Sequence, residues 1–362
     1  MENLLVNWTK INEIRGGCES LFNDLKNAIP NSRLVGYSDA AKNAELMLSI
    51  DSLGYGKEPS AAYIIDEYIN YYNLLNGNIS VVSNAGIAGV WFKPKYRLIN
   101  IFNDPYKVIF PVLTRLTSPD AQMRAMNVAH QIKYSKIATR MQIIAGERAE
   151  KNICVSEYMK KIYEEMGVKN LEVIHPGVDF NVFKPLNNKD AIREKYGIPK
   201  DKKVIISVTK PQVAKGWHIL KDLCNTMKDV HWLFVCTNIP EGNIKIKKKN
   251  VTLLNTLPRE QMPELYNAAD VFCLPSLVES YGISTVEAMA CNLPIVMSKT
   301  GLFSDWGSGD CGKILSRFDP KLYEDSIREI LKGEETYSPR KVAEQEKLDL
   351  DTFNNKWRKV IG

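Results

Sequence analysis

The sequence has no long apolar run, because nothing in it approaches the ~20 consecutive apolar residues that a membrane-spanning helix requires. This absence argues against an integral membrane protein. Residues Met1 to Trp8 are too few and carry no basic lead, so they are read as a first strand and not as a secretory signal. Low-complexity tracts and short-period repeats are also missing, which argues against a disordered or solenoid chain.

The cysteines lack any paired spacing. There are seven, an odd number, and none forms a Cys-x-x-Cys pattern. A disulfide framework or a structural zinc site needs such spacing, so reduced thiols are expected instead. We therefore predict a cytoplasmic protein, either free or peripheral to a membrane.

Other catalytic patterns are missing or incomplete. Gly54-Tyr55-Gly56 lacks the third glycine and the preceding strand of a dinucleotide fingerprint, and no Gly-x-Ser-x-Gly elbow occurs. Asp349-Leu350-Asp351 falls in the terminal helical region and is read as a solvated face. No other grouping has metal-ligand spacing, so we expect neither a metal nor a resident cofactor.

The length and the net charge of the chain are compatible with a two-domain enzyme. The 362 residues are enough for two domains with separate cores. The net charge of +6 is mild. It permits a basic cleft for an acidic ligand but does not by itself argue for nucleic acid.

Short apolar runs alternate with helical segments along the chain, which predicts parallel sheets covered by helices on both faces. The segments His175–Asp179 and Phe183–Pro185 interrupt this alternation and read as a linker. The expected strands are Asn3–Val6, Arg33–Gly36, Glu45–Ile50, Ile79–Ser83, Leu98–Phe102, Ile153–Val155, Leu171–Ile174, Val204–Val208, Trp232–Cys236, Val251–Leu254, Val271–Leu274 and Ile295–Met297.

The most informative stretch runs from Asp270 to Pro294. A buried strand, Val271–Leu274, is followed by a polar loop with Gly282, and then by a short helix capped by Ser284 or Thr285. A strand, a glycine loop and a helix N-terminus together form an anion site, because free amides and the helix dipole point at the ligand.

Two glutamates bracket this loop, Glu279 before Gly282 and Glu287 inside the helix. Carboxylates beside an anion site fit a diphosphate attached to sugars, since amides take the phosphates and carboxylates accept hydrogen bonds from hydroxyls. The alternative is a capped helix with two solvated glutamates.

This stretch closely resembles the signature of the family 4 retaining glycosyltransferases, the glycosyl transferases group 1. Their pattern of Glu, seven residues, Glu, Ala-Met-Ala and a later Pro is met here by Glu279, Glu287, Ala288-Met289-Ala290 and Pro294. Asn292 stands where the family usually has Gly, a small change because Asn tolerates a left-handed turn.

The resemblance implies the α/β fold called GT-B, with two Rossmann-like parallel-sheet domains facing a cleft and a C-terminal helix that crosses back to the first domain. It implies an N-terminal acceptor domain at residues 1–178, joined by a helix at about 343–362. The donor domain would span residues 179–342.

A second loop, Val208–Gly216, follows a strand, leads into a helix and carries Lys210 and Lys215, which could reach a diphosphate from two sides. The family has Arg, four residues, Lys-Gly here, so Lys215 matches and Lys210 replaces the arginine. Two exposed loop lysines are the alternative. The resemblance implies donor binding by Gly16, Gly17, Lys210, Lys215, Leu257, Glu279, Ser280, Tyr281, Gly282, Ile283 and Glu287.

Some of these residues also fit plainer roles. Gly16-Gly17 suits an ordinary helix-entry turn, and Leu257 suits a packing role. For the two glutamates the resemblance implies distinct partners. The resemblance implies that Glu287 accepts hydrogen bonds from the ribose hydroxyls. It implies that Glu279 accepts hydrogen bonds from hydroxyls of the transferred sugar.

One family feature is missing. Many members carry His after the strand that matches Leu98–Phe102, where this chain has Asn103 and Asp104. Asn can bond a sugar hydroxyl but cannot take up a proton near pH 7. His130 could serve instead, although a lone helical His is more often structural. The expected catalytic residues are Glu279, Lys215, Lys210, Asn103 and Asp104.

The function that the resemblance implies is retaining transfer of a hexose from a UDP- or GDP-linked donor to an unidentified glycan, lipid or other acceptor, without a metal. A non-catalytic sugar-nucleotide-binding scaffold is one alternative. The other is a glycosyltransferase that modifies nucleic acid through the basic region Arg115–Lys151. This region could equally face a membrane surface or water, and exposure to water is the preferred explanation.

Overall fold

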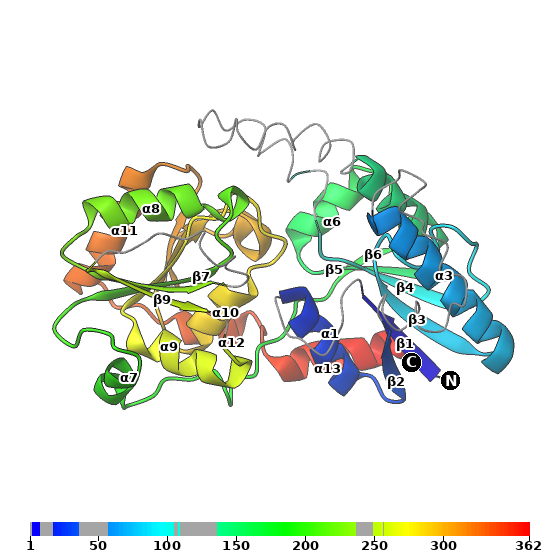
Figure 1. The fold of residues 1–362 in the computed structure, drawn as a ribbon, viewed down its shortest axis with the longest axis horizontal. Helices are drawn as coiled ribbons and strands as arrows, with labels where there is room; N and C mark the ends of the chain where they lie inside the picture. Colours follow the sequence, from blue (N-terminus) through cyan, green and yellow to red (C-terminus); the bar gives the residue numbers. More distant parts are fainter. Residues whose placement is uncertain are drawn as a thin grey trace. The chain divides into compact units, whose positions relative to one another are not determined.

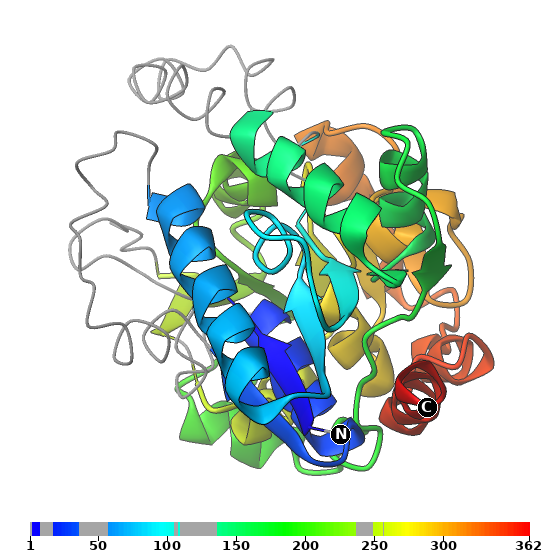
Figure 2. The same cartoon turned by 90° about the vertical axis from the view of Figure 1, so that its right-hand side faces the viewer.

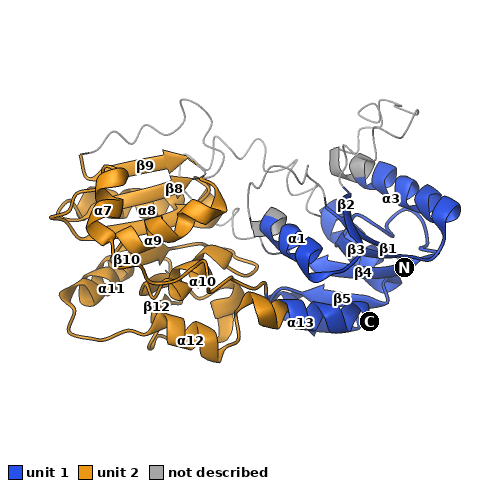
Figure 3. Cartoon of the chain, turned by 90° about the horizontal axis from the view of Figure 1, so that it is seen from below, with its two compact units in different colours: residues 1–175, 354–362 blue, residues 176–353 orange. Residues whose placement is uncertain are grey.

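The computed structural model describes residues 2–7, 17–35, 57–104, 108, 136–236, 249–255 and 257–362. The chain divides into two compact units (Figures 1 and 3): Met1–His175 with Asn354–Gly362, and Pro176–Phe353. The division expected after residue 178 lies close to this one. The return expected at about residue 343 begins later, at Asn354, because α12 (Pro339–Gln345) still packs against α10 (Ile283–Ala290) in the second unit.

The first unit is built on a six-stranded sheet in the order β2-β1-β3-β4-β5-β6, with every pair parallel. Helices α1 (Gly17–Ala28), α3 (Lys57–Asn76) and α6 (Glu157–Glu164) belong to this unit, as does a helix over residues 136–148. The strands are β1 (Glu2–Val6), β2 (Ser32–Val35), β3 (Ile79–Asn84), β4 (Arg97–Phe102), β5 (Lys151–Cys154) and β6 (Leu171–Val173).

The second unit repeats this architecture with the order β12-β11-β10-β7-β8-β9, again all parallel. Its strands are β7 (Val204–Thr209), β8 (His231–Cys236), β9 (Val251–Asn255), β10 (Val271–Leu274), β11 (Ile295–Ser298) and β12 (Gly312–Leu315). Beside α10 and α12 it contains α7 (Lys189–Lys195), α8 (Trp217–Thr226), α9 (Met262–Ala268) and α11 (Pro320–Lys332).

The predicted α/β class with two parallel sheets is confirmed. The expected strands appear with small differences at their ends, except that Glu45–Ile50 lies outside the described residues. β12 was not expected, and the helical run Lys341–Val360 is two helices, α12 and α13 (Leu350–Ile361). No helix in the described part of the chain has the length and apolar character needed to cross a bilayer.

Helix α13 is the last helix of the chain, and its residues from Asn354 onward belong to the first unit. Its start is capped by Asp349, which accepts hydrogen bonds from Thr352 N at 2.8 Å and Thr352 Oγ1 at 2.7 Å. Asp349 is therefore a helix cap and not simply part of a solvated face. At the far end, the Arg97 guanidinium donates to the carbonyls of Val360 at 2.8 Å and Ile361 at 2.6 Å, while Trp357 is buried. These bonds satisfy carbonyls that a helix end leaves open.

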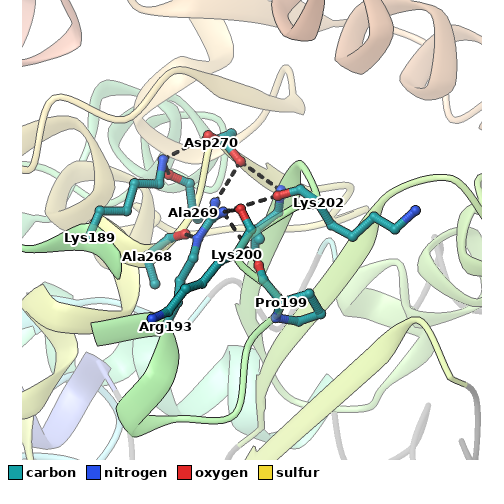
Figure 4. Close-up of polar contacts among 9 residues, drawn as sticks. Lys189, Arg193, Pro199, Lys200, Lys202, Ala268, Ala269 and Asp270 are labelled. Carbon is teal, nitrogen blue, oxygen red and sulfur yellow. Dashed lines mark hydrogen bonds and ion pairs between the residues drawn. The ribbon is translucent and has the colours of Figure 1, made fainter. Parts of the chain in front are cut away.

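A buried ion pair ties α7 to the amino ends of the central strands in the second unit (Figure 4). Arg193 donates to Asp270 Oδ2 at 2.9 Å and to the Ala268 carbonyl at 2.8 Å, and its side chain is only 5% exposed. Asp270 also accepts from the Val204 amide and from Lys189 Nζ, each at 2.7 Å. The two carboxylate oxygens thus hold α7, β7 and β10 together.

At the opposite ends of these strands, two loops meet by direct backbone approach. Gly216 has φ +71°, and a Cβ built on it would lie 2.0 Å from the Pro275 carbonyl oxygen. The amide of Leu277 donates to the Ala214 carbonyl at 2.8 Å. The loop after β7 and the loop after β10 are therefore locked together, and only glycine fits at the contact.

We predict that Asp270→Asn lowers the free energy of unfolding by on the order of 3 kcal/mol, because Arg193 would remain buried without its counter-charge. Urea denaturation measures this. Burial alone would raise the pKa of Asp270, but the hydrogen bond and charge of Lys189 outweigh burial and lower it.

Because this pKa is lowered on folding, the stabilisation is complete above the unfolded-state pKa and is lost as the pH falls through the folded-state value. The difference between wild type and Asp270→Asn should therefore shrink in acid. Glu194→Gln is the control, since its pair with Lys200 is exposed and its loss should change nothing measurable. Equal effects of the two substitutions would contradict the prediction.

A second prediction compares two glycines that both have positive φ. Gly197 has φ +65° and nothing within 4 Å of the point that a Cβ would occupy, so Gly197→Ala should cost about 1 kcal/mol of backbone strain alone. Gly216→Ala must also push the Pro275 carbonyl away, so its urea midpoint should fall clearly further. Similar midpoints for the two variants would show that the loops are not locked.

Candidate functional site

The stretch after β10 folds largely as its sequence predicts. The strand ends at Leu274, a loop follows, and Gly282 with φ +101° precedes helix α10. The amides of Thr285 and Val286 donate to the Gly282 carbonyl at 3.0 and 3.3 Å, which leaves the amides of Ile283 and Ser284, with the helix dipole, available to an anion. All the carboxyl ends of a parallel sheet lie along one edge, which places this loop beside the loop after β7.

Glu279 is buried in this loop, with 9% exposure. Its Oε1 accepts from Lys215 Nζ at 2.8 Å and from Ser276 Oγ at 2.8 Å. Its backbone amide donates to Thr300 Oγ1 at 3.2 Å. Its Oε2 receives no hydrogen bond from the described part of the chain, so one carboxylate oxygen is held in place and the other remains an open acceptor.

Glu287 of α10 is held in place by neighbours that include Tyr266 and Arg259. Tyr266 OH donates to its Oε2 at 2.9 Å, and Arg259 Nε donates to its Oε1 at 3.3 Å. Burial, and then the charge of Glu287, raise the pKa of Tyr266, which therefore stays a neutral donor. Each carboxylate oxygen has a second lone pair, so Glu287 can still accept from a ligand hydroxyl.

The two lysines of the loop after β7 differ in their surroundings. Lys215 ends a short 3-10 turn, Val213–Lys215, and is paired with Glu279. Lys210 is half-buried, and its ammonium has no ion pair or hydrogen bond with any residue that the structure describes. Among the described residues, the two lysines of this loop thus supply one paired and one unpaired positive charge.

Four further predicted residues lie in or near this arrangement. Tyr281 is buried, and its hydroxyl donates to the Pro176 carbonyl at 2.9 Å, so its side chain faces inward. Ser280 and Ile283 flank the turn at Gly282 and are half-buried. Leu257 follows β9 and is half-buried as well.

In the first unit, Asn103 and Asp104 follow β4 at the carboxyl edge of its sheet, where their sequence position placed them. The Asp104 carbonyl accepts from Tyr163 OH at 2.9 Å and Gln142 Nε2 at 3.1 Å. Asn84 Nδ2 lies 3.5 Å from Asp104 Oδ2. Gly17 begins α1, whereas Gly16 and His130 lie outside the described residues.

Sequence reasoning missed the residues that hold the two glutamates. Ser276 and Thr300 fix Glu279, and Tyr266 and Arg259 fix Glu287. Ser276 and Arg259 carry a weak signal, since both are polar and follow a strand within a few residues. No local pattern points to Tyr266 or Thr300, because their contacts arise only from packing.

The arrangement suits a ligand that carries both negative charge and hydroxyl groups. Lysines and helix amides attract anionic oxygens, while Glu279 and Glu287 accept from hydroxyl donors. Within the described residues, no group of three or more His, Cys, Asp or Glu side chains is placed to hold a metal ion.

Comparison with known proteins finds similarity within the second unit. Residues 188–347 match the family model of the glycosyl transferases group 1. The D-inositol 3-phosphate glycosyltransferase of Mycolicibacterium smegmatis is 32% identical over 188 residues, covering 48% of this chain and 43% of that protein. That of Mycobacteroides abscessus is 31% identical over 143 residues, covering 36% and 32%. The matches thus span less than half the length of these curated relatives.

Solved structures match over the full length of the chain. Sucrose-phosphate synthase of Thermosynechococcus elongatus superposes with a TM-score of 0.77 at 16% identity, covering 100% of this chain and 98% of that one. HepE of Anabaena, solved in complex with UDP-glucose, gives 0.75 at 18% identity, covering 100% and 99%. The chain therefore has the GT-B fold, and its residues 188–347 are similar to the glycosyl transferases group 1.

Proposed function

We propose that this protein is a glycosyltransferase that moves a hexose from a nucleotide-diphosphate donor, linked to UDP or GDP, onto an acceptor that is still to be identified. The observation that carries the proposal is the pairing of Lys215 with Glu279 at the carboxyl edge of the second sheet, beside the N-terminus of α10 and Glu287. A sugar nucleotide fits such a site, because its diphosphate binds cations and amides while its sugar hydroxyls donate to carboxylates.

Each group has a role in this proposal. Glu287 accepts from the ribose hydroxyls while Tyr266 and Arg259 keep its orientation. Glu279 accepts from the transferred sugar through Oε2. Lys210, Lys215 and the amides at Tyr281 and Gly282 offset the charge that grows on the leaving diphosphate, an effect worth about 2–4 kcal/mol per key donor.

The proposed reaction retains the anomeric configuration and uses no metal. The leaving phosphate draws the proton from the acceptor hydroxyl, which attacks on the face that the phosphate leaves, so no carboxylate nucleophile is required. Fixed lysines and helix amides take the place of a cation. HepE, bound to UDP-glucose in its solved complex, supports a uridine donor as the first candidate.

The predicted cytoplasmic location is part of the same proposal. The six cysteines whose side chains are described, all except Cys18, are free and buried. Unpaired thiols suit a reducing compartment.

A binding protein without turnover is the second candidate, because Asn103 stands where many relatives have His. An amide at this position can orient a sugar hydroxyl but cannot move its proton. The two candidates differ in whether a bound donor is ever broken down.

The direct test is a panel of UDP- and GDP-sugars in a thermal-shift assay, followed by measurement of released nucleoside diphosphate. We expect one donor to raise the melting temperature by mass action and to be hydrolysed or transferred, with equal rates in EDTA and in Mg²⁺. Binding without release in the presence of glycan and lipid acceptors would favour the scaffold. Loss of activity in EDTA, restored by Mg²⁺ or Mn²⁺, would contradict the metal-free mechanism.

Removal of Lys210 and removal of Lys215 should have different effects on donor binding, turnover and stability. Lys210→Ala removes a charge with no described partner, so it should weaken donor binding and leave the urea midpoint unchanged. Lys215→Ala should reduce turnover by on the order of a hundredfold and also lower stability, because Glu279 loses its cation. Lys210→Arg is the control that keeps the charge and should preserve activity; if it abolishes donor binding in a folded protein, the diphosphate assignment fails.

Substitutions of the two glutamates should affect nucleotide binding and turnover differently. Glu287→Ala should weaken binding of the free nucleoside diphosphate in calorimetry by roughly 1.5–3 kcal/mol, the value of a charge-assisted hydrogen bond. Glu279→Gln should leave that affinity nearly intact while lowering transfer or hydrolysis. Equal loss of both properties in Glu279→Gln would mean that Glu279 only supports the loop.

A further inference from the structure

Exposed apolar side chains gather on one part of the first unit. They lie near the end of α3 and in the loop between β3 and β4, a loop of residues 85–96. Their exposed fractions are high for large apolar residues, which rarely cluster on a free surface without a partner. They are Tyr71 at 60%, Leu74 at 80%, Leu75 at 65%, Trp91 at 47% and Phe92 at 36%.

Helix α3 and this loop run side by side. The ring of Tyr63 on α3 meets Trp91 edge-on at 5.9 Å and Phe92 at 5.6 Å between centroids. Further along α3, Asn73 Nδ2 donates to the Lys95 carbonyl at 3.4 Å. The loop therefore follows the helix, whose course is seen in Figure 2, and we call this area the aromatic–lysine surface. It comprises Tyr63, Tyr71, Leu74, Leu75, Trp91, Phe92, Lys93 and Lys95.

The loop is held rigidly in this exposed position. Asp66 of α3 is fully buried, and its carboxylate accepts from the amides of Gly89, Trp91 and Phe92, each at 3.0 Å. Arg148 donates to the carbonyls of Gly89 and Val90, each at 2.9 Å. Because the backbone is fixed by these bonds, the exposure of the two aromatic rings is built into the fold.

The charges beside the rings are mainly positive. Lys93 and Lys95 are exposed and follow the aromatic pair directly in the loop, and Arg148 lies against the same loop. They outnumber the two acidic residues there, which are Asp66, buried beneath the loop, and Glu67, which lies beside Tyr63. Exposed Trp and Phe with neighbouring lysines are the chemistry of a bilayer interface, where rings enter the headgroup region and ammonium groups meet anionic lipids.

We propose that the aromatic–lysine surface docks the first unit onto an anionic lipid bilayer. A second copy of the chain fits this surface less well, since a symmetric contact would bring like-charged lysines together. Nucleic acid would use the lysines but would gain nothing from Leu74 and Leu75. The proposal stands apart from the proposed catalytic function, because none of these residues belongs to the donor site.

The test is flotation of the full chain with vesicles of phosphatidylcholine alone or mixed with phosphatidylglycerol. Wild type should bind the mixed vesicles, and binding should weaken with rising salt. Trp91→Ser with Phe92→Ser should lower the partition coefficient by at least about tenfold, because two aromatic side chains lose their burial. Lys93→Gln with Lys95→Gln should lower it by about fivefold per lysine.

Matched controls come from the second unit. Phe318→Ser removes another exposed aromatic ring, and Lys332→Gln with Lys341→Gln removes the same charge from other exposed positions. Both should bind vesicles as wild type does, and all variants should keep the wild-type melting temperature. The lysine pair tests the proposal even if the aromatic variant fails to fold.

Three results would overturn the proposal. Wild type could fail to float with anionic vesicles, or the surface variants could float as well as the controls. Alternatively, light scattering could show a dimer that the aromatic substitutions dissociate, which would assign the surface to a second copy of the chain.

Discussion

The contact between the Gly216 backbone and the Pro275 carbonyl is the constraint on which the candidate site depends. Lys215 immediately precedes that glycine, and Glu279 lies in the loop just after Pro275. The close approach of the two loops therefore brings Lys215 Nζ within 2.8 Å of Glu279 Oε1. No side chain could stand between the loops. The charge pair is thus a consequence of backbone geometry, and its position is set before any ligand arrives, which is the requirement for electrostatic preorganisation.

The site also shows how an anion-binding region can carry carboxylates without repelling its ligand. Each acid is matched by a nearby cation, Lys215 for Glu279 and Arg259 for Glu287. The local charge is therefore close to balanced at the glutamates, while Lys210 remains as an uncompensated cation among the described residues. In the proposed function, the diphosphate meets this lysine and the helix amides, and the sugar and ribose hydroxyls meet the glutamates.

Local sequence signals predicted the parts of the fold that depend on local chemistry. The β10 strand and its glycine turn could be read from a short apolar run, a proline and a glycine, and the structure has β10 at the same bounds. β12 could not be read, because Gly312–Leu315 is short and becomes a strand only by pairing with β11. The partners of the glutamates were hidden for a similar reason: Tyr266 reaches Glu287 across 21 positions of sequence, and only the packing of α9 against α10 brings them together.

Helix α13 has a consequence for the order in which the protein is made. The sheet of the first unit is complete at Val173, yet Arg97 in that sheet bonds the carbonyls of Val360 and Ile361, and buried Trp357 belongs to the same unit. The ribosome must therefore synthesise the entire second unit before the first can bury its last helix. During that interval, the surface that Trp357 will cover is open to chaperones and to misfolding, and the two units complete their folding in the reverse of the order in which they begin it.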